Sequence, residues 1–401
     1  MKTHIYIFNE GARGSRYGVG TYVNHLIDCF KDDASILLNI VLLGSESAEF
    51  TVNEDALVPV IHITAIHNIS NPKQLGLYHR NAAYLLADYI NIPASDRLIF
   101  HFNYLSYELL KNLKKLFPVS YSVYSIHLDS MCLSYKGNIR LVKDKLNQQQ
   151  QNEKIYHEYE VKMYKEIDHI ICLSNFMRDL VVNYYKMPAS KVSLIYNSTK
   201  DVRVILTEIE KRQLKQRLLI PENEKLILFV GRLDKIKGVG ELIKAFKRVV
   251  YEIPDATLVI IGEGDFKEYF SMCEGFWNKI IFTGMLSKEW LYKFYQIADM
   301  GVIPSFYEQC SYVTIEIMMY GLPIIGTTAP GLDEMIENPA DKIQITYSDF
   351  DACISSDHLA ECIIRNLKQN KETENYRYIY LSKYFFDEFK NKTKAVYQFT
   401  R

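Results

Sequence analysis

The apolar positions of the second half of the chain fall into two alternating kinds of segment. Short continuous apolar runs are typical of parallel strands that are buried on both faces. Such runs predict strands at 226–230, 257–261, 279–282, 300–303 and 323–325. Apolar residues recur every three to four positions in longer segments between them, which predicts helices at 239–253 and 287–298. Repeated strand–helix–strand units form a parallel sheet with helices on both faces.

The first half repeats this pattern more loosely. Its strand candidates lie at 5–8, 37–43, 98–102, 120–126, 169–173 and 192–196. The predicted fold class is therefore α/β, with two tandem Rossmann-like, doubly wound domains. A break at 197–205 and the charged run 208–217 mark the junction, which gives domains at 1–200 and 201–375. The aromatic-rich tail, 376–401, is expected to form a helix that packs back on the N-terminal domain.

One segment near the end of the second sheet places two glutamates around the start of a helix. Ser311 suits the N-cap, Gly321 the left-handed C-terminal position, and Pro323 prevents continuation. Glu308 then precedes the helix, and Glu316 lies inside it. Free amides at a helix start bind anions, and carboxylates accept hydrogen bonds from hydroxyl groups. This combination suits a phosphate-linked sugar.

A glycine-rich turn after the first strand of the second half carries two cations. Arg232 follows Gly231 directly, and Lys237 stands just ahead of a helix start. Arginine offers a planar donor fork and lysine a mobile point charge, so the pair could hold a diphosphate. A solvated basic turn is the alternative. The glutamates downstream favour the interpretation as a diphosphate site. Both segments follow strands, so both lie at the carboxyl edge of the sheet. The two domains are expected to turn these edges toward a shared cleft.

Further short motifs follow in a fixed order. They are Gly262-Glu263-Gly264, Thr283-Gly284 with Leu286, Ala298-Asp299, Pro304-Ser305, Gly321-Leu-Pro323, and Gly331 with Glu334. With the segments above, they resemble the donor-binding domain of the retaining glycosyltransferases of family 4, which have the two-domain GT-B fold. The resemblance covers residues 226–337. In the first half, Gly18 and Gly20 resemble the family's glycine-rich loop and His127 its cleft histidine, while 168–174 and Asn197 resemble the closing segments of the acceptor domain.

The resemblance implies a role for each matching position. Arg232 and Lys237 would bind the donor diphosphate, Glu316 the ribose, and Glu308 the hydroxyls of the transferred sugar. His127 would face the sugar and the acceptor. The remaining donor-binding positions implied are Gly18, Gly20, Gly231, Gly262, Gly284, Leu286, Cys310, Ser311 and Tyr312.

The sequence departs from the family pattern at three places. Tyr17 stands where a second glycine is usual, and Cys310-Ser311 replaces an aromatic–glycine pair. Leu128 separates His127 from Asp129, which are often adjacent in the family. These departures bear on the identity of the sugar and on the function of Asp129.

Several residues have a plainer interpretation than a catalytic one. Cys310 has no strongly basic neighbour in sequence and is more typical of a packing residue than of a nucleophile. Gly262-Glu-Gly264 lacks the third glycine of a dinucleotide-binding motif. His101, at the end of a strand, is more typical of a hydrogen-bonded structural histidine. The basic run 136–145 is typical of a solvated helix, with a loop that faces an acceptor or a membrane as the alternative.

The amino-acid composition limits the cellular compartments and the classes of partner that we expect for this protein. The chain has 47 basic and 48 acidic residues, which does not favour a nucleic-acid partner. Its seven cysteines are scattered without a Cys-x-x-Cys pair, so neither a zinc site nor a disulfide framework is predicted. No apolar run suits a signal peptide or a membrane span. We expect a cytoplasmic protein that needs no metal or other cofactor, with peripheral membrane contact left open.

These observations predict an enzyme that moves a sugar from a UDP- or GDP-linked donor to a glycan, lipid-linked or peptide acceptor. The resemblance to family 4 further implies retention at the anomeric carbon. A non-catalytic partner subunit of the same fold is one alternative. Another GT-B enzyme, a phosphorylase or a sugar-nucleotide epimerase, is a second.

Overall fold

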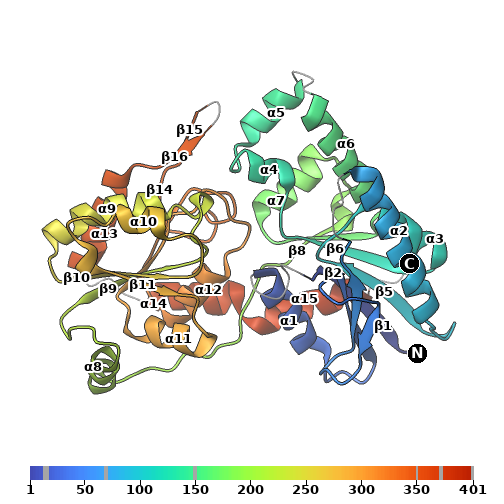
Figure 1. Ribbon diagram of the computed structural model, residues 1–401, viewed down its shortest axis with the longest axis horizontal. Coiled ribbons are helices and arrows are strands. Elements are labelled where there is room, and N and C mark those ends of the chain that lie inside the picture. Colours follow the sequence, from blue (N-terminus) through green and yellow to red (C-terminus); the bar gives the residue numbers. More distant parts are fainter. Residues whose placement is uncertain (12–17, 67–70, 148–150, 349–350, 370–373, 399–401) are drawn as a thin grey trace. The chain divides into compact units, whose positions relative to one another are not determined.

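The computed structural model describes residues 1–11, 18–66, 71–147, 151–348, 351–369 and 374–398 (Figure 1). Its internal contacts divide the chain into two compact units. The first comprises Met1–Met131, Asp144–Ile195 and Lys390–Arg401, and the second comprises Cys132–Lys143 and Tyr196–Phe389. The first unit thus includes the end of the chain, and the second a short segment from its first half.

The described part of the first unit forms an eight-stranded sheet in the order β3-β4-β2-β1-β5-β6-β7-β8. All neighbours are parallel except β3, which runs antiparallel to β4 at one edge. The strands are β1 (Thr3–Glu10), β2 (Ile36–Ser45), β3 (Thr51–Asn53), β4 (Val60–Thr64), β5 (Arg97–Phe102), β6 (Tyr121–Ile126), β7 (His169–Cys172) and β8 (Val192–Leu194). The sequence missed the edge strand β3 and its neighbour β4, because both are short and only partly buried and lack a continuous apolar run.

Helices cover both faces of this sheet, as a parallel sheet requires. Figure 1 shows α2 (Pro72–Tyr89), α3 (Tyr107–Leu116) and α6 (Gln151–Glu166) on one face, and α1 (Gly18–Phe30) with the end of α15 (Phe386–Gln398) on the other. Adjacent residues of β5 point to opposite faces. Phe100 contacts Phe117 at the end of α3, and His101 contacts Tyr397 of α15. The remaining helical segments are α7 (Asn175–Asp179), η1 (Leu180–Tyr184) and η2 (Ala189–Lys191), while α4 (Ser130–Ser134) and α5 (Ile139–Asn147) cross the division between the units.

The described part of the second unit forms a six-stranded parallel sheet in the order β11-β10-β9-β12-β13-β14. Its strands are β9 (Lys225–Val230), β10 (Ala256–Ile261), β11 (Ile280–Gly284), β12 (Met300–Ile303), β13 (Ile324–Thr327) and β14 (Lys342–Ile343). A separate hairpin pairs β15 (Thr346–Tyr347) with β16 (Ala352–Cys353). The apolar runs identified in the sequence therefore form the centre of this sheet, and the predicted fold class of two Rossmann-like α/β domains is confirmed.

In the second unit, α9 (Val239–Glu252), α10 (Lys267–Ser271) and α13 (Ser356–Lys368) cover one face of the sheet (Figure 1). The other face carries α11 (Lys288–Ile297), α12 (Tyr312–Tyr320) and α14 (Glu374–Ile379). The unit also contains α8 (Glu208–Arg217), η3 (Lys235–Lys237), η4 (Trp277–Lys279), η5 (Pro339–Asp341) and η6 (Tyr380–Tyr384). A Cβ at Gly301 of β12 would lie 2.4 Å from the Ile317 Cδ1 atom, so α12 packs closely on this strand only because residue 301 is glycine.

The aromatic part of the tail is buried within the second unit, so the prediction that the tail packs on the N-terminal domain applies only to its last turns. Its buried members are Tyr376, Tyr380, Tyr384, Phe386 and Phe389, whereas Tyr378 is 70% exposed. The last turns of α15 lie in the first unit, where the Tyr397 ring packs 5.2 Å from the Phe30 ring, measured between centroids. Among the described residues, no helix is both long and apolar enough to cross a membrane.

Candidate functional site

The strand order of the second unit changes direction between β9 and β12. The chain proceeds from β9 to β10 and β11 on one side and from β12 to β13 and β14 on the other. In open parallel sheets, ligands bind outside the carboxyl ends of the strands at such a switch point. Gly231 and Arg232 follow β9, and the segment that leads to Glu308 follows β12. The two segments that the sequence selected therefore leave adjacent strands at this point.

Glycines line the carboxyl ends of β9, β10 and β11. The amide of Gly262 donates to the carbonyl of Gly284, and the amide of Gly231 donates to the carbonyl of Ile261. A Cβ at Gly262, where φ is +147°, would lie 1.8 Å from the Gly231 carbonyl oxygen. The two turns can lie this close only without a side chain, which leaves backbone exposed at the strand ends.

The turn after β9 is shaped by Asp234. Its carboxylate accepts the amide of Lys237 at 3.2 Å, which caps η3, and also pairs with the Arg232 guanidinium at 3.0 Å. The side chain of Arg232 is half exposed. Gly238 follows at a left-handed φ of +69° and starts α9. Arg232 and Lys237 are thus held on one short turn beside the switch point.

Glu308 links this turn to the loop after β12. Its Oε1 atom lies 2.5 Å from the Lys237 Nζ atom and accepts the Ser305 hydroxyl at 2.9 Å. Ser305 is fixed in turn, because its carbonyl accepts the Thr327 hydroxyl from β13. Lys237 and Glu308 remain only partly exposed, with side-chain exposures of 22% and 13%. The predicted phosphate-binding lysine and the predicted sugar-binding glutamate therefore form one ion pair.

The loop before α12 is held by its backbone. Asn197 donates to the Cys310 carbonyl at 2.6 Å, and a Cβ at Gly331 would lie 2.0 Å from the Gln309 carbonyl oxygen. Ser311 is the N-cap of α12 and accepts the Thr314 amide at 3.2 Å, while Gly321 ends the helix at a φ of +73°. Both helix boundaries agree with the prediction. The start of α12 therefore follows Glu308 closely in the chain.

Cys310 is a buried packing residue. Its side chain is almost fully buried, and this burial raises the pKa of the thiol well above its ordinary value. A thiol that stays protonated is a poor nucleophile. The structure therefore favours the packing interpretation, and Cys310 can serve a ligand only through its backbone.

Glu316 is buried inside α12. It accepts the Tyr295 hydroxyl at 3.1 Å, and burial raises the pKa of its carboxyl, opposed by the charge of Lys288 and by the Tyr295 hydrogen bond. Lys288 is the first residue of α11 and follows Leu286 closely in sequence. The segment 283–288 and Glu316 therefore belong to the same neighbourhood. Lys288 is a charged residue there that the sequence analysis overlooked.

The first unit has its own switch point between β1 and β5. Gly18 begins α1, and Gly20 is buried in its first turn; Tyr17 lies outside the described residues. His127 follows β6, where its Nε2 atom lies 2.8 Å from the Asn103 Oδ1 atom and its ring meets the Tyr22 ring edge-on at 4.6 Å. Burial lowers the pKa of His127 far below its ordinary value, so the ring is neutral near pH 7.

His101 is a structural residue, as the sequence suggested. It is completely buried, with its Nδ1 atom 2.5 Å from the Tyr397 hydroxyl and its Nε2 atom 2.8 Å from the Ser125 hydroxyl. Both ring nitrogens are thus occupied by protein partners. His101 has no free nitrogen with which to transfer a proton to a ligand.

Asp129 belongs to a buried carboxyl pair. The Tyr185 Oη atom lies 2.8 Å from Asp129 Oδ2 and 2.5 Å from Glu160 Oε2. A hydroxyl has one hydrogen and can donate it to only one of them. Glu160 can complete the second contact by keeping its own proton and donating it to the Tyr185 oxygen. Burial, together with the charge of Asp129, raises the pKa of Glu160 to about 8. This pair anchors the loop that carries His127.

Asn103, Ser305 and Asn197 position the predicted site residues, yet the sequence analysis assigned no such contact to them. Asn103 and Ser305 each come just after a buried strand, a position that often carries polar ligand-binding residues. That signal was available for both. Among the described residues, no group of three or more His, Cys, Asp or Glu side chains could hold a metal ion.

Two family matches cover most of the chain. Residues 18–201 match Glycosyltransferase Family 4, and residues 210–379 match Glycosyl transferases group 1. The chain belongs to the family 4 glycosyltransferases. The motifs at 226–337 that suggested this family therefore lie within the segment that matches Glycosyl transferases group 1.

Relatives of this family 4 chain occur in archaea and bacteria. It is 30% identical over 259 residues to an uncharacterized glycosyltransferase of Methanocaldococcus jannaschii, covering 62% of this chain and 64% of the relative. It is 27% identical over 178 residues to alpha-monoglucosyldiacylglycerol synthase of Streptococcus pneumoniae, covering 43% and 40%. The matched region thus spans less than two thirds of these curated relatives.

Solved structures with the same fold match nearly the whole family 4 chain. Sucrose-phosphate synthase from Thermosynechococcus elongatus has a TM-score of 0.76 at 18% identity, over 99% of this chain and 98% of that one. Anabaena HepE, solved in complex with UDP and glucose, has a TM-score of 0.71 at 16% identity, over 98% of each chain. At these identities the likeness concerns the fold.

Proposed function

We propose that this protein transfers a sugar from a nucleoside-diphosphate donor to an acceptor hydroxyl and retains the configuration at the anomeric carbon. The main support is the arrangement at the switch point of the second sheet, where Lys237 and Glu308 pair between β9 and β12 beside the start of α12. A cation for the diphosphate and a carboxylate for sugar hydroxyls are both present there. Family membership supports the same reaction class.

Each side chain would act on a defined part of the donor. Arg232 and Lys237 stabilise the negative charge that grows on the diphosphate as the bond to the anomeric carbon breaks. Glu308 accepts hydrogen bonds from the sugar hydroxyls, and Glu316 from the ribose. The acceptor oxygen bonds to the anomeric carbon from the face that the phosphate leaves, and its proton passes to the departing phosphate oxygen. Charge stabilisation by Arg232, Lys237 and the amides of α12 would make a metal ion unnecessary.

The donor class is proposed to be UDP- or GDP-linked, with a cell-surface glycan or a lipid-linked intermediate as acceptor. The streptococcal relative is named for a glycolipid product, and HepE was solved with UDP and glucose. We further propose a cytoplasmic reaction with peripheral membrane contact during acceptor binding. Acceptor screens should include a peptide together with the glycan and lipid-linked acceptors.

The decisive experiment is a panel of UDP-, GDP- and ADP-sugars, measured by thermal shift and by slow donor hydrolysis with and without EDTA. We expect one donor class to raise the melting temperature and to be hydrolysed, and EDTA to change neither. Lys237→Ala and Glu316→Ala should remove both effects, while Lys244→Ala, an exposed lysine of α9, should leave them unchanged.

Each alternative gives a different result in the same panel. A non-catalytic partner subunit would show neither a shift nor hydrolysis. An epimerase would convert its nucleotide sugar without an acceptor, and a phosphorylase would show the absorbance of a bound pyridoxal cofactor. Any of these results would contradict the proposed transfer reaction.

A further inference from the structure

A cavity lies in the second unit, away from the switch point. Its volume is about 360 Å³, within the range of pockets that bind small molecules. Lys225 begins β9, while Asp299 and Pro323 immediately precede β12 and β13, and all of them line this cavity. It therefore lies at the amino edge of the sheet, opposite the edge that carries Arg232 and Glu308. We call it the amino-edge cavity.

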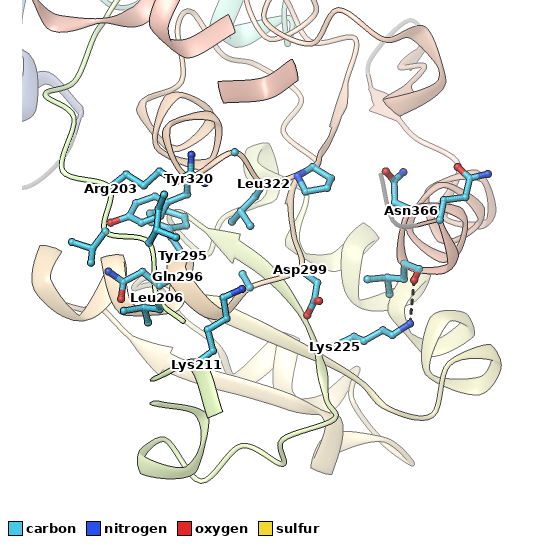
Figure 2. Close-up of a pocket in the computed structure, with 17 residues that line it drawn as sticks. Arg203, Leu206, Lys211, Lys225, Tyr295, Gln296, Asp299, Tyr320, Leu322 and Asn366 are labelled. Carbon is cyan, nitrogen blue, oxygen red and sulfur yellow. Dashed lines mark hydrogen bonds between the residues drawn. The ribbon is translucent and has the colours of Figure 1, made fainter. Parts of the chain in front are cut away.

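The amino-edge cavity is rich in cations. Arg203, Lys211 and Lys225 line it, together with the carboxylate of Asp299. In Figure 2, Arg203 and Tyr320 lie at one end and Lys225 and Asn366 at the other, with Lys211 and Asp299 between them. Lys211 pairs with Glu208 at 2.8 Å, and Lys225 donates to the Leu367 carbonyl at 3.1 Å. The guanidinium of Arg203 makes no hydrogen bond or ion pair with any residue that the structure describes, although its charge acts on Asp201 and on Tyr320.

Two buried polar atoms on the cavity wall also lack a protein partner within the described ranges. They are the Tyr320 hydroxyl and the Asn366 Oδ1 atom, and each residue is only 6% exposed. The Asn366 amide nitrogen is already used, because it donates to Asp341 and to the Cys362 carbonyl. Leaving a buried polar atom without a partner is costly, so such atoms usually meet a ligand or water.

The carboxyl end of a helix carries partial negative charge, which disfavours an anion at this edge. Three of the last four carbonyls of α12, those of Ile317, Met318 and Met319, already accept hydrogen bonds from other donors. Arg377 Nη1 donates to the Met319 carbonyl at 2.7 Å, and the Leu322 amide donates to the Ile317 carbonyl at 3.1 Å. Arg203 is therefore not needed to neutralise this helix end.

We propose that the amino-edge cavity binds a small hydroxylated organic anion of the sugar-phosphate class. Its phosphate contacts Arg203 and the Tyr320 hydroxyl, where cation and hydroxyl donors lie together. Its sugar hydroxyls donate to the carboxylate of Asp299 and to Asn366 Oδ1. The cavity therefore offers a cation and a hydroxyl donor at the Arg203 end, and acceptors at Asp299 and Asn366 along the rest of its wall, which suits a ligand that carries both an anionic group and hydroxyl groups.

The cavity wall also continues to the donor site. The Tyr320 ring stacks on the Tyr295 ring at 5.4 Å, and the Tyr295 hydroxyl donates to Glu316. Both tyrosines line the cavity. A bound anion therefore changes donor affinity through Tyr295, and a bound donor changes anion affinity by the same factor. This coupling rests on the proposed function, whereas binding of the anion does not.

Calorimetric titration of the full chain with glucose 6-phosphate and with inorganic phosphate tests the site directly. We expect saturable binding of glucose 6-phosphate that is tighter than that of phosphate. Arg203→Gln and Tyr320→Phe should each weaken it about tenfold or more, since each removes a hydrogen bond to a charged group. Arg212→Gln is the matched control, because Arg212 lies on α8 beside the cavity but pairs with Glu222 at 2.7 Å.

Tyr320→Phe is especially informative, because it removes a hydroxyl that has no protein partner and should leave the melting temperature unchanged or higher.

Absence of saturable binding at millimolar glucose 6-phosphate would overturn the site, as would binding that survives both variants. Equal affinities for glucose 6-phosphate and phosphate would overturn the assignment of the hydroxyl-binding end. If Lys237→Ala abolishes binding and Arg203→Gln leaves it intact, the anion binds at the donor site instead of the amino-edge cavity. If glucose 6-phosphate binds but no donor does, the proposed function fails and the cavity assignment stands.

Discussion

The Lys237 Nζ atom lies 2.5 Å from the Glu308 Oε1 atom, across the switch point of the second sheet. Both groups are partly shielded from solvent, so each depends on the other for its partner. A nucleotide sugar would offer phosphate oxygens to the lysine and hydroxyls to the glutamate. Donor binding is therefore expected to replace this ion pair with two separate sets of contacts.

Lys237→Ala should lower kcat by about 100- to 1,000-fold, the usual effect of removing one group that stabilises developing charge. The reason is that the leaving diphosphate loses a cation positioned on the turn after β9. Steady-state kinetics with the donor found in the panel measures this change. A similar loss in Lys244→Ala would show that the effect is not specific to the ion pair with Glu308.

Glu316→Gln should weaken donor binding about tenfold without lowering stability. The amide keeps the size of the side chain but replaces a charged acceptor, and a hydrogen bond to a charged group contributes about 1.5–3 kcal/mol. Because a buried carboxylate is costly to the fold, the melting temperature should stay unchanged or rise. Donor titration and thermal unfolding test both parts, and a large drop in melting temperature would instead indicate a structural function for Glu316.

Stability should fall between about pH 4.5 and 8 because of Glu160. Its pKa is raised from 4.5 to about 8 in the folded protein, mainly by burial and then by the charge of Asp129. The folded state thus holds a proton that the unfolded chain has released, so this contribution is complete below pH 4.5 and is lost as pH rises toward 8. Glu160→Gln should flatten the melting temperature across this range. Glu158→Gln, an exposed neighbour on α6, should keep the wild-type slope, and an unchanged slope in Glu160→Gln would contradict the assignment.

Tyr397→Phe should destabilise the protein by about 1–3 kcal/mol, because it leaves the buried His101 Nδ1 atom without its partner. Chemical denaturation measures the change in the free energy of unfolding. The control is Tyr378→Phe, whose side chain is 70% exposed and should have little effect. Equal effects of the two variants would show that the His101 contact does not hold the end of α15.

Gly262→Ala should reduce both stability and donor binding. Its Cβ would lie 1.8 Å from the Gly231 carbonyl oxygen, so the turn that carries Arg232 must move. Gly275→Ala is matched in having a positive φ, of +87°, but no atom lies within 4 Å of the added Cβ. Gly275→Ala should therefore lower only the melting temperature. If Gly262→Ala retains donor binding as fully as Gly275→Ala does, the close approach of the two turns is not needed for donor binding.

The local elements of the second unit were predictable because their signals are local. The strand at 300–303 and the helix from Tyr312 to Tyr320 have the predicted bounds, since a continuous apolar run and the Ser311 and Gly321 caps act within one segment. The edge strand β3 and its neighbour β4 were missed, because each is a short, partly buried strand that is recognised by its partner in the sheet more than by its own residues.

By itself, the sequence determined the fold class, the family and the residues that could hold a diphosphate and a sugar, since each depends on residue type and spacing. Only the tertiary structure decided how those residues are held. It paired Lys237 with Glu308, placed Asn103 against His127 and buried Glu160 beside Asp129. It also formed the amino-edge cavity from segments more than 160 residues apart, Arg203 to Gln369. The physical reason is that hydrogen bonds, buried charges and cavities arise from contacts between distant segments, which no local pattern encodes.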